Sequence, residues 1–514
     1  MKKSKYILIG IIIIQIIVQI LVANTKEYIH MDEGYSLGLM NYDKVEIQDN
    51  EDFYNTWHTS NYYEDYLSIQ GDESYKLVYE NQKNDVHPPL YYLLLRIVSS
   101  VHTDSYSKWP GIALNIFINI FCTILVYLIT KKIFKSDKYA LLIAAVSGVS
   151  SSTLNAILYI RMYELCAFNI LLTLYLHLKI ENKEAKILDY ILIGITALIG
   201  SLTHYYYLFF LAVIYIMYIV NYIRKKEYKL AIKYTASMVV TGILSIAIFP
   251  YSISHMFKGN RGTGAISNLT GNAETWLNIA KYIGNLFINV FGNMGFVFVV
   301  ILIGIAIYKL VKNKKLEIKN ENKLMWIITI PTLVYFILIA IMSPYIELRY
   351  IMPICPLVLI IMIYFLRSSI SSIVTEKKAE YIIASLLIVM VLFPLITNQK
   401  LEMSYNDKKD IVQKLENEYN LPTIFLFNKS HNRFLDDILL FSKINESYVY
   451  DLENMSEQKI QEIFEEKDIS KGIIVFVNAG QDKDNNLEIV KQALNLSEIT
   501  YLKGMNACSI YHIK

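Results

Sequence analysis

Long runs of apolar residues, separated by short polar connections, are the feature that most restricts what this chain can fold into. A helix of roughly 18 to 25 apolar residues crosses a hydrocarbon core about 30 Å thick, and we predict about eleven such spans. Since 54% of the 514 residues are hydrophobic, we expect a mainly α-helical, polytopic membrane protein. The predicted spans are 6–23, 110–130, 139–157, 160–178, 187–203, 205–223, 231–251, 282–308, 324–342, 350–366 and 380–397.

The positions of Lys and Arg predict the orientation of these spans, because basic residues near span ends stay on the cytoplasmic side. Every second connection is basic, beginning with Lys2 and Lys3 before the first span and continuing with Lys131 and Lys132 after the second. We therefore expect a cytoplasmic N-terminus, with the 24–109 loop, the 252–281 loop and the segment after 397 outside. The first span lacks a small-residue cleavage site before Glu27, so we expect it to be retained as an anchor.

Charge and cysteine content exclude several classes. The net charge of +3 sums a basic cytoplasmic face and acidic outer segments, and gives no support for binding nucleic acid. The four cysteines are widely scattered, so neither a disulfide framework nor a thiolate metal site is indicated. The abundance of Ile, Lys, Asn and Tyr fits an AT-rich bacterial gene, which predicts a bacterial plasma membrane as the location.

Two domains are predicted. Residues 1–399 hold the spans and the outer loop 24–109, whose many Tyr and Trp residues suggest short amphipathic helices on the outer leaflet. Residues 400–514 read as a small extracytoplasmic α/β domain that could fold alone. Its expected strands are 423–427, 447–450 and 472–477, and its expected helices are 408–419 and 456–466.

Asp32 and Glu33 stand just beyond the first span and are the first candidates for chemistry. A carboxylate within hydrogen-bond reach of an acceptor hydroxyl can take its proton while the hydroxyl attacks a sugar carbon. The alternative is a pair of solvated boundary acids without a role.

Four further ionisable residues fall on the same predicted outer face, each from a different connection: His87, Arg161, His204 and Arg349. Each alone has an ordinary explanation, such as a surface histidine, an interface arginine paired with Glu164, or a boundary charge. Ionisable residues that converge at membrane depth are costly unless they are paired or functional. Their convergence therefore predicts a site, with His87 and the two arginines suited to phosphate oxygens.

The motifs around these residues resemble the GT-C glycosyltransferases, and within them bacterial relatives of the protein O-mannosyltransferases and the lipid A aminoarabinose transferase. The resemblance covers about residues 1–400. It rests on the acid pair after the first span, His87-Pro88-Pro89-Leu90-Tyr91-Tyr92, Arg161-Met162-Tyr163, Thr203-His204-Tyr205, and Arg349-Tyr350-Ile351 before Pro353.

The resemblance implies an inverting transfer of a sugar from a polyprenyl-phosphate donor to a glycan, lipid or protein acceptor on the outer face. Asp32 would be the base or would orient acceptor and metal, with Glu33 beside it. Arg161 and Arg349 would hold the donor phosphate, with His87, Tyr163, His204, Tyr205 and Tyr350 as further substrate contacts.

This chain departs from the pattern at His87, where the aminoarabinose-transferase branch has a lysine. No cofactor is implied with certainty, and a divalent metal ion stays open because the superfamily differs on this point. A lipid-linked saccharide flippase and a non-catalytic envelope scaffold are the alternatives. A flippase should show broken helices with mid-span charges in related halves, and the sequence shows mostly uninterrupted apolar runs.

Overall fold

The computed structural model describes residues 2–43, 47–70, 75–181, 185–269, 275–291, 295–311, 323–396, 401–405, 408–416, 420–428, 433–478, 482–505 and 507–514. The chain divides into two compact units. The helical unit comprises Met1–Asn24, Asp85–Tyr91 and Ile112–Glu402, and the mixed unit comprises Thr25–Asn84, Tyr92–Gly111 and Met403–Lys514. The second is thus built from the outer loop together with the tail, whereas we expected the domain boundary near residue 400.

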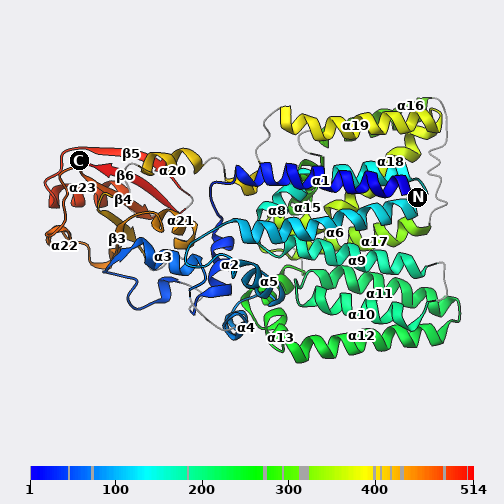
Figure 1. Ribbon diagram of the computed structural model, residues 1–514, viewed down its shortest axis with the longest axis horizontal. Coiled ribbons are helices and arrows are strands. Elements are labelled where there is room, and N and C mark those ends of the chain that lie inside the picture. Colours follow the sequence, from blue (N-terminus) through cyan, green and yellow to red (C-terminus); the bar gives the residue numbers. More distant parts are fainter. Residues whose placement is uncertain are drawn as a thin grey trace. The chain divides into compact units, whose positions relative to one another are not determined.

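The helical unit is a bundle of long apolar helices (Figure 1). Because lipid offers no hydrogen-bond partners, a spanning segment must satisfy its own backbone, and a helix does so. The helices are α1 (Lys2–Asn24), α6 (Trp109–Phe134), α7 (Asp137–Ser147), α8 (Ser151–Leu158), α9 (Tyr163–Ile180), α10 (Ile187–Ser201), α11 (Tyr207–Arg224), α12 (Tyr228–Ile248), α13 (Ser252–Phe257), α14 (Asn260–Asn268), α15 (Thr275–Phe291), α16 (Gly295–Val311), α17 (Lys323–Met342), α18 (Cys355–Ser371) and α19 (Glu376–Ile396).

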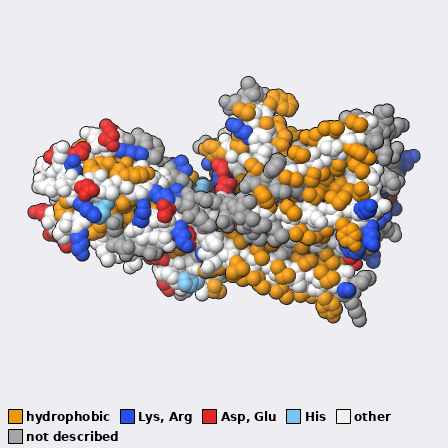
Figure 2. Space-filling model, turned by 90° about the horizontal axis from the view of Figure 1, so that it is seen from above, with side chains coloured by type: hydrophobic (Ala, Val, Ile, Leu, Met, Phe, Trp, Pro, Cys, Tyr) orange, Lys and Arg blue, Asp and Glu red, His pale blue; other side chains and the backbone are white. Residues whose placement is uncertain are grey.

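The surface of the helical unit fits a membrane protein. Figure 2 shows hydrophobic side chains covering its flank, with Lys and Arg gathered at one end. In the described residues six helices are long and apolar enough to cross a membrane, or seven if the bent pair α7 and α8 is one span. Helices α10 and α5 (Leu90–Ser99) are shorter apolar helices. The polytopic fold is confirmed, and the expected number of about eleven spans is not established.

Two expected spans differ in detail. The segment expected at 139–157 is a pair of helices, α7 and α8, bent by 47°. The bend is stabilised from α1, where Gln15 Nε2 donates to the Ala144 carbonyl (2.8 Å) and Gln19 Nε2 donates to the Gly148 carbonyl (2.8 Å). A Cβ on Gly148 would lie 2.2 Å from Gln15 Nε2, so a larger residue there would displace the end of the Gln15 side chain. The segment expected at 282–308 is covered by α15 and α16, and residues 292–294 between them lie outside the described part.

The mixed unit is an α/β fold around a six-stranded sheet. The strand order is β1-β3-β2-β4-β6-β5, with β2 parallel to both β3 and β4 and the other pairs antiparallel. The strands are β1 (Trp57–Thr59), β2 (Thr423–Phe427), β3 (Glu446–Asp451), β4 (Ile473–Asn478), β5 (Ile499–Gly504) and β6 (Cys508–Ile513). The helices are α2 (Met31–Asn41), α3 (Ser60–Leu67), α4 (Tyr75–Asn84), α20 (Lys409–Glu416), α21 (Ile438–Phe441), α22 (Glu457–Phe464) and α23 (Lys483–Ala493), and α5 continues into this unit.

Strand chemistry explains the order in the sheet. Central β2 and β4 are apolar almost throughout and fully buried, as expected for parallel strands covered on both faces. One face packs on α22 and α23 through Ile460, Leu487 and Val490. All three predicted strands of the tail are present, whereas β1 comes from the outer loop and pairs with β3, Trp57 opposite Tyr448.

Candidate functional site

The predicted acid pair opens helix α2 in the mixed unit, and its two carboxylates have different surroundings. His30 precedes the helix, and its Nδ1 accepts a hydrogen bond from the Asp32 backbone N–H (3.1 Å). Glu33 completes this capping box by accepting from the His30 N–H (2.9 Å) through Oε2. The motif therefore begins a helix at this position, with both acids in its first turn, where the helix dipole favours negative charge.

Glu33 is fully buried and ion-paired. Its Oε2 lies 3.0 Å from Lys26 Nζ, and both side chains are almost inaccessible, at 0% and 1% exposure. Lys26 also donates to the Met403 carbonyl (2.9 Å) and lies 4.8 Å from the centre of the Tyr405 ring. Burial lowers the pKa of Lys26, and the charge of Glu33 partly offsets this effect. These contacts tie the start of α2 to the tail.

Asp32 keeps access to solvent. Its side chain is 19% exposed, and its Oδ2 lies 3.8 Å from His30 Nδ1. The neighbouring Met31 N–H donates to Asp436 Oδ1 (3.2 Å), which fixes the helix start beneath it. Of the two predicted acids, Asp32 is therefore the one with a reachable carboxylate.

The other predicted residues meet at one end of the helical unit. Asp85 accepts from the His87 backbone N–H (3.1 Å) and contacts His87 Nδ1 (3.0 Å), which leaves His87 Nε2 directed at Arg161 Nη2, 3.5 Å away. The rings of His87 and His204 have centroids 6.0 Å apart. His87 precedes α5, Arg161 precedes α9, and His204 lies in the turn before α11, so three separate connections build this cluster.

A tyrosine layer joins this cluster to Arg349. The Tyr163 ring lies 5.5 Å from His204, 5.8 Å from Tyr159 and 6.4 Å from Tyr350. Arg349 Nη1 donates to the Tyr159 hydroxyl (3.4 Å), and its guanidinium carbon lies 5.3 Å from the centre of the Tyr350 ring. Tyr205 is directed elsewhere, with its hydroxyl 2.9 Å from His255 Nδ1. His87, Arg161, Tyr163, His204, Arg349 and Tyr350 are thus brought together as predicted.

Protonation in this cluster is set by burial and by its cations. Burial opposes ionisation of Asp85, but the charges of His87 and Arg161 and the hydrogen bonds from His87 outweigh it, so the pKa of Asp85 lies below its usual value. Burial lowers the pKa of His204 well below its usual value, and the charges of His87 and Arg161 add to this effect. His204 is therefore neutral at pH 7.

The neutral His204 ring presents one N–H. Its Nδ1 accepts from the Tyr206 N–H (3.1 Å), so the ring proton lies on Nε2. Within the described part of the chain nothing is hydrogen-bonded to that buried Nε2, and the residue is 5% exposed. A buried donor of this kind costs free energy unless a ligand accepts from it.

Sequence reasoning missed two contributors. Asp85 stands two residues before His87, a spacing that lets a carboxylate orient the ring, and this signal could have been used. His255, the partner of Tyr205, belongs to the loop 252–281, which we predict to lie outside, and carries no local motif. Glu164, an expected partner of Arg161, accepts a hydrogen bond from Asn119 Nδ2 (2.8 Å) inside the bundle.

No group of three or more His, Cys, Asp or Glu side chains in the described residues is arranged to hold a metal ion. The possible divalent metal stays an open expectation from the resemblance. Two acids beside the cluster, Asp85 and Glu347, contact His87 and Arg349 respectively.

Solved structures define the class of fold: this chain has the GT-C fold of polytopic membrane glycosyltransferases. The structure of ArnT from Cupriavidus metallidurans bound to undecaprenyl phosphate is similar over 98% of this chain and 97% of that chain, with a TM-score of 0.52 and 9% identity. Its apo structure matches over 100% and 98%, with a TM-score of 0.51 and 10% identity. No protein-family model matches the sequence. No curated protein matches it either.

Proposed function

We propose that this chain transfers a sugar, with inversion, from a polyprenyl-phosphate donor to an acceptor on the outer face of a bacterial plasma membrane. The proposal rests on the cluster of Arg161, His87 and His204 in a chain of GT-C fold. Arg349 lies beside this cluster and donates a hydrogen bond to the Tyr159 hydroxyl. ArnT, which shares that fold, was solved with undecaprenyl phosphate.

The donor phosphate is the group that this cluster suits. Guanidinium groups donate in a planar fork to phosphate oxygens, and burial strengthens each contact by lowering the local dielectric. The N–H of neutral His204 supplies a further donor that is already oriented by Tyr206. Donors fixed before the reaction stabilise the charge that collects on the phosphate as the sugar leaves.

Asp32 is proposed as the general base. An acceptor hydroxyl oxygen forms a bond to the anomeric carbon while the bond from that carbon to the phosphate oxygen breaks. The bonding electron pair leaves with the lipid phosphate, and the hydroxyl proton passes to the Asp32 carboxylate. Glu33 is proposed to act by positioning, because its Oε2 is occupied by Lys26 and by the His30 N–H.

The test is mass spectrometry of lipid-linked sugars and envelope glycans in a host that lacks the chain. We expect one lipid-linked sugar to accumulate and one envelope glycoconjugate to lose that sugar. Wild type should restore both pools, whereas Asp32→Asn should fail to restore them while still inserting into the membrane. Losing a general base slows transfer by about 10²- to 10⁴-fold.

Asp52→Asn, at an exposed position of the same loop, is the matched control and should restore both pools. Unchanged pools in the deletion host would overturn the transferase proposal as a whole. Full restoration by Asp32→Asn would overturn the role of Asp32 and leave the transferase proposal standing. A lipid-linked sugar trapped on the cytoplasmic side would favour a flippase.

A further inference from the structure

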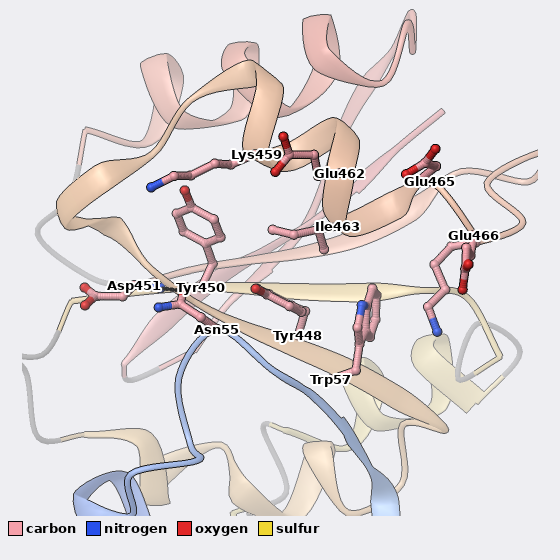
Figure 3. A pocket seen from close by; sticks show the side chains of 11 residues that line it. Asn55, Trp57, Tyr448, Tyr450, Asp451, Lys459, Glu462, Ile463, Glu465 and Glu466 are labelled. Carbon is pink, nitrogen blue, oxygen red and sulfur yellow. Dashed lines mark hydrogen bonds between the residues drawn. The ribbon is translucent and has the colours of Figure 1, made fainter.

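The mixed unit contains a groove of about 810 Å³ between helix α22 and the β1 edge of the sheet (Figure 3). Its residues come from two distant parts of the chain: Asn55 and Trp57 from the outer loop, and residues 448–467 from the tail. Both parts of the chain are therefore needed to form the groove, which lies where β1 joins the sheet of the tail. Its size falls within the range of about 300 to 1,000 Å³ that is typical of small-molecule sites.

The floor of the groove is aromatic. Trp57 meets Tyr448 edge to face, with ring centroids 5.5 Å apart, and Phe464 fixes the indole from another side at 5.6 Å. Tyr448 and Tyr450 share one face of β3, with centroids 6.3 Å apart. Trp57 and Tyr448 are only partly buried. Lys467 Nζ lies 4.2 Å from the centre of the Trp57 ring and covers part of it, so the Trp57 and Tyr448 rings each keep only part of their surface open to the groove, and Tyr450 is buried.

The rim is polar and mainly acidic. Asp451, Glu462, Glu465 and Glu466 line it, together with the amines of Lys459 and Lys467. Figure 3 shows Glu462 of α22 and Glu465, which directly follows the helix, on one wall, opposite the Trp57 and Tyr448 rings. Because Lys467 is ion-paired with Glu446, the side chains that line the groove carry a net negative charge. Asn55 closes one end in a left-handed conformation (φ 56°), held by its N–H donating to the Val449 carbonyl (2.8 Å).

Rings and carboxylates in this arrangement match the two chemistries of a sugar. A pyranose has an apolar face of C–H groups that packs on an aromatic ring, and hydroxyls that donate to carboxylate oxygens. The excess of carboxylates disfavours polyphosphate or uronic-acid chains by like-charge repulsion. We propose that this groove binds a segment of an oligosaccharide without acidic groups. Such a site goes beyond the transfer reaction, since it would retain a glycan whether or not Asp32 acts on it.

The experiment is a glycan array probed with the full-length protein, followed by calorimetric titration of the best ligand. The array carries neutral and amino-sugar oligosaccharides, acidic oligosaccharides and an oligolysine peptide. The protein is kept in an amine-oxide detergent, because maltoside headgroups are sugars and would compete. We expect the neutral or amino-sugar chains to bind, and Trp57→Ala to weaken the best of them by at least about tenfold through loss of the stacking surface.

Tyr501→Ala is the matched control, because Tyr501 is an aromatic residue 59% exposed on β5, the opposite edge strand of the same sheet. The double variant Glu462→Gln/Glu465→Gln alters only exposed residues, one in α22 and one directly after it, and should also weaken binding, which tests the groove if Trp57→Ala fails to fold. Glu457→Gln, on the same helix but outside the groove, should bind as wild type does.

Binding of the peptide or the acidic glycans alone would overturn the proposal. So would the absence of any neutral or amino-sugar ligand on the array, or equal affinity in the double variant and wild type.

Discussion

Two clusters of buried ionisable residues behave differently in this protein. In the mixed unit Lys26 and Glu33 form a fully buried ion pair whose remaining bonds go to the Met403 carbonyl and the His30 N–H. In the helical unit Asp85, His87, Arg161 and His204 are also largely buried, but the His204 Nε2–H has no acceptor among the described residues. The first cluster makes its hydrogen bonds within the chain, whereas the second presents an N–H donor to a ligand.

This difference indicates which buried charges have a structural role and which bind a ligand. A charge whose bonds are all made within the chain stabilises one geometry, and removing its partner leaves an uncompensated ion. A cationic cluster with an oriented, unmet donor is less stable alone than with an anion bound. The two clusters should therefore respond in opposite ways to substitution, one in stability and the other in ligand affinity.

The largest expected effect is on stability. Lys26→Met should lower the free energy of unfolding by about 3 to 5 kcal/mol, because Glu33 is left buried without its cation. Thermal unfolding of the detergent-solubilised protein, followed by intrinsic fluorescence, measures it. Adding Glu33→Leu should recover part of the loss. Arg161→Met should cost less than Lys26→Met, and the comparison between the clusters fails if the two losses are equal.

The next effect is on phosphate binding. Arg161→Gln should weaken binding of undecaprenyl phosphate by roughly ten- to a hundredfold, the value of one hydrogen bond between charged groups. Titration with the lipid in mixed micelles gives the affinity. Arg224→Gln, at an exposed position in the last turn of α11, should bind as wild type does. Equal affinity of the Arg161 and Arg224 variants would contradict the proposal that this cluster binds the donor phosphate.

A smaller effect is expected at His204. His204→Leu removes the Nε2–H donor and should lower kcat/KM for transfer by about tenfold, whereas His204→Gln keeps an N–H and should lose less. Since the pKa of His204 lies well below its usual value, wild type should show no titration of this residue between pH 6 and 8. If the two variants lose comparable kcat/KM, the role of a neutral N–H donor is contradicted. It is also contradicted if the pH profile of wild-type kcat/KM shows a titration near pH 6.5 that His204→Gln abolishes.

The smallest effect is a pH dependence from Asp85. The pKa of Asp85 is lower in the folded protein than its ordinary value of 3.8. Between these two pKa values the native state therefore binds fewer protons than the unfolded state. The stability it contributes is complete above about pH 4 and is lost as pH falls through the folded-state pKa. Unfolding temperatures of wild type and Asp85→Asn should therefore converge over the acidic interval below about pH 4. A constant gap over that interval would show that Asp85 does not orient His87 through its charge.

Much of the fold could be predicted because the relevant signals are local. Runs such as Thr423–Phe427 and Ile473–Asn478 are set by residues next to one another, and both strands were located within one residue. The expected fold class is confirmed by the solved GT-C structures.

Other features could not be predicted because they depend on distant partners. The strand β1 is three residues long and has no pattern of its own, so only its pairing with β3 makes it a strand. The bend between α7 and α8 depends on Gln15 and Gln19 from α1, more than a hundred residues away in sequence.

The sequence by itself determined that the chain is a polytopic membrane protein and which residues were candidates for chemistry, because transfer to lipid is governed by local composition and charge. Tertiary structure alone decided that Glu33 is buried against Lys26 while Asp32 keeps access to solvent, and which contacts His87 makes with Arg161 and His204. The physical reason is that the state of a buried polar group depends on its partners, and folding chooses those partners from parts of the chain that local patterns do not connect.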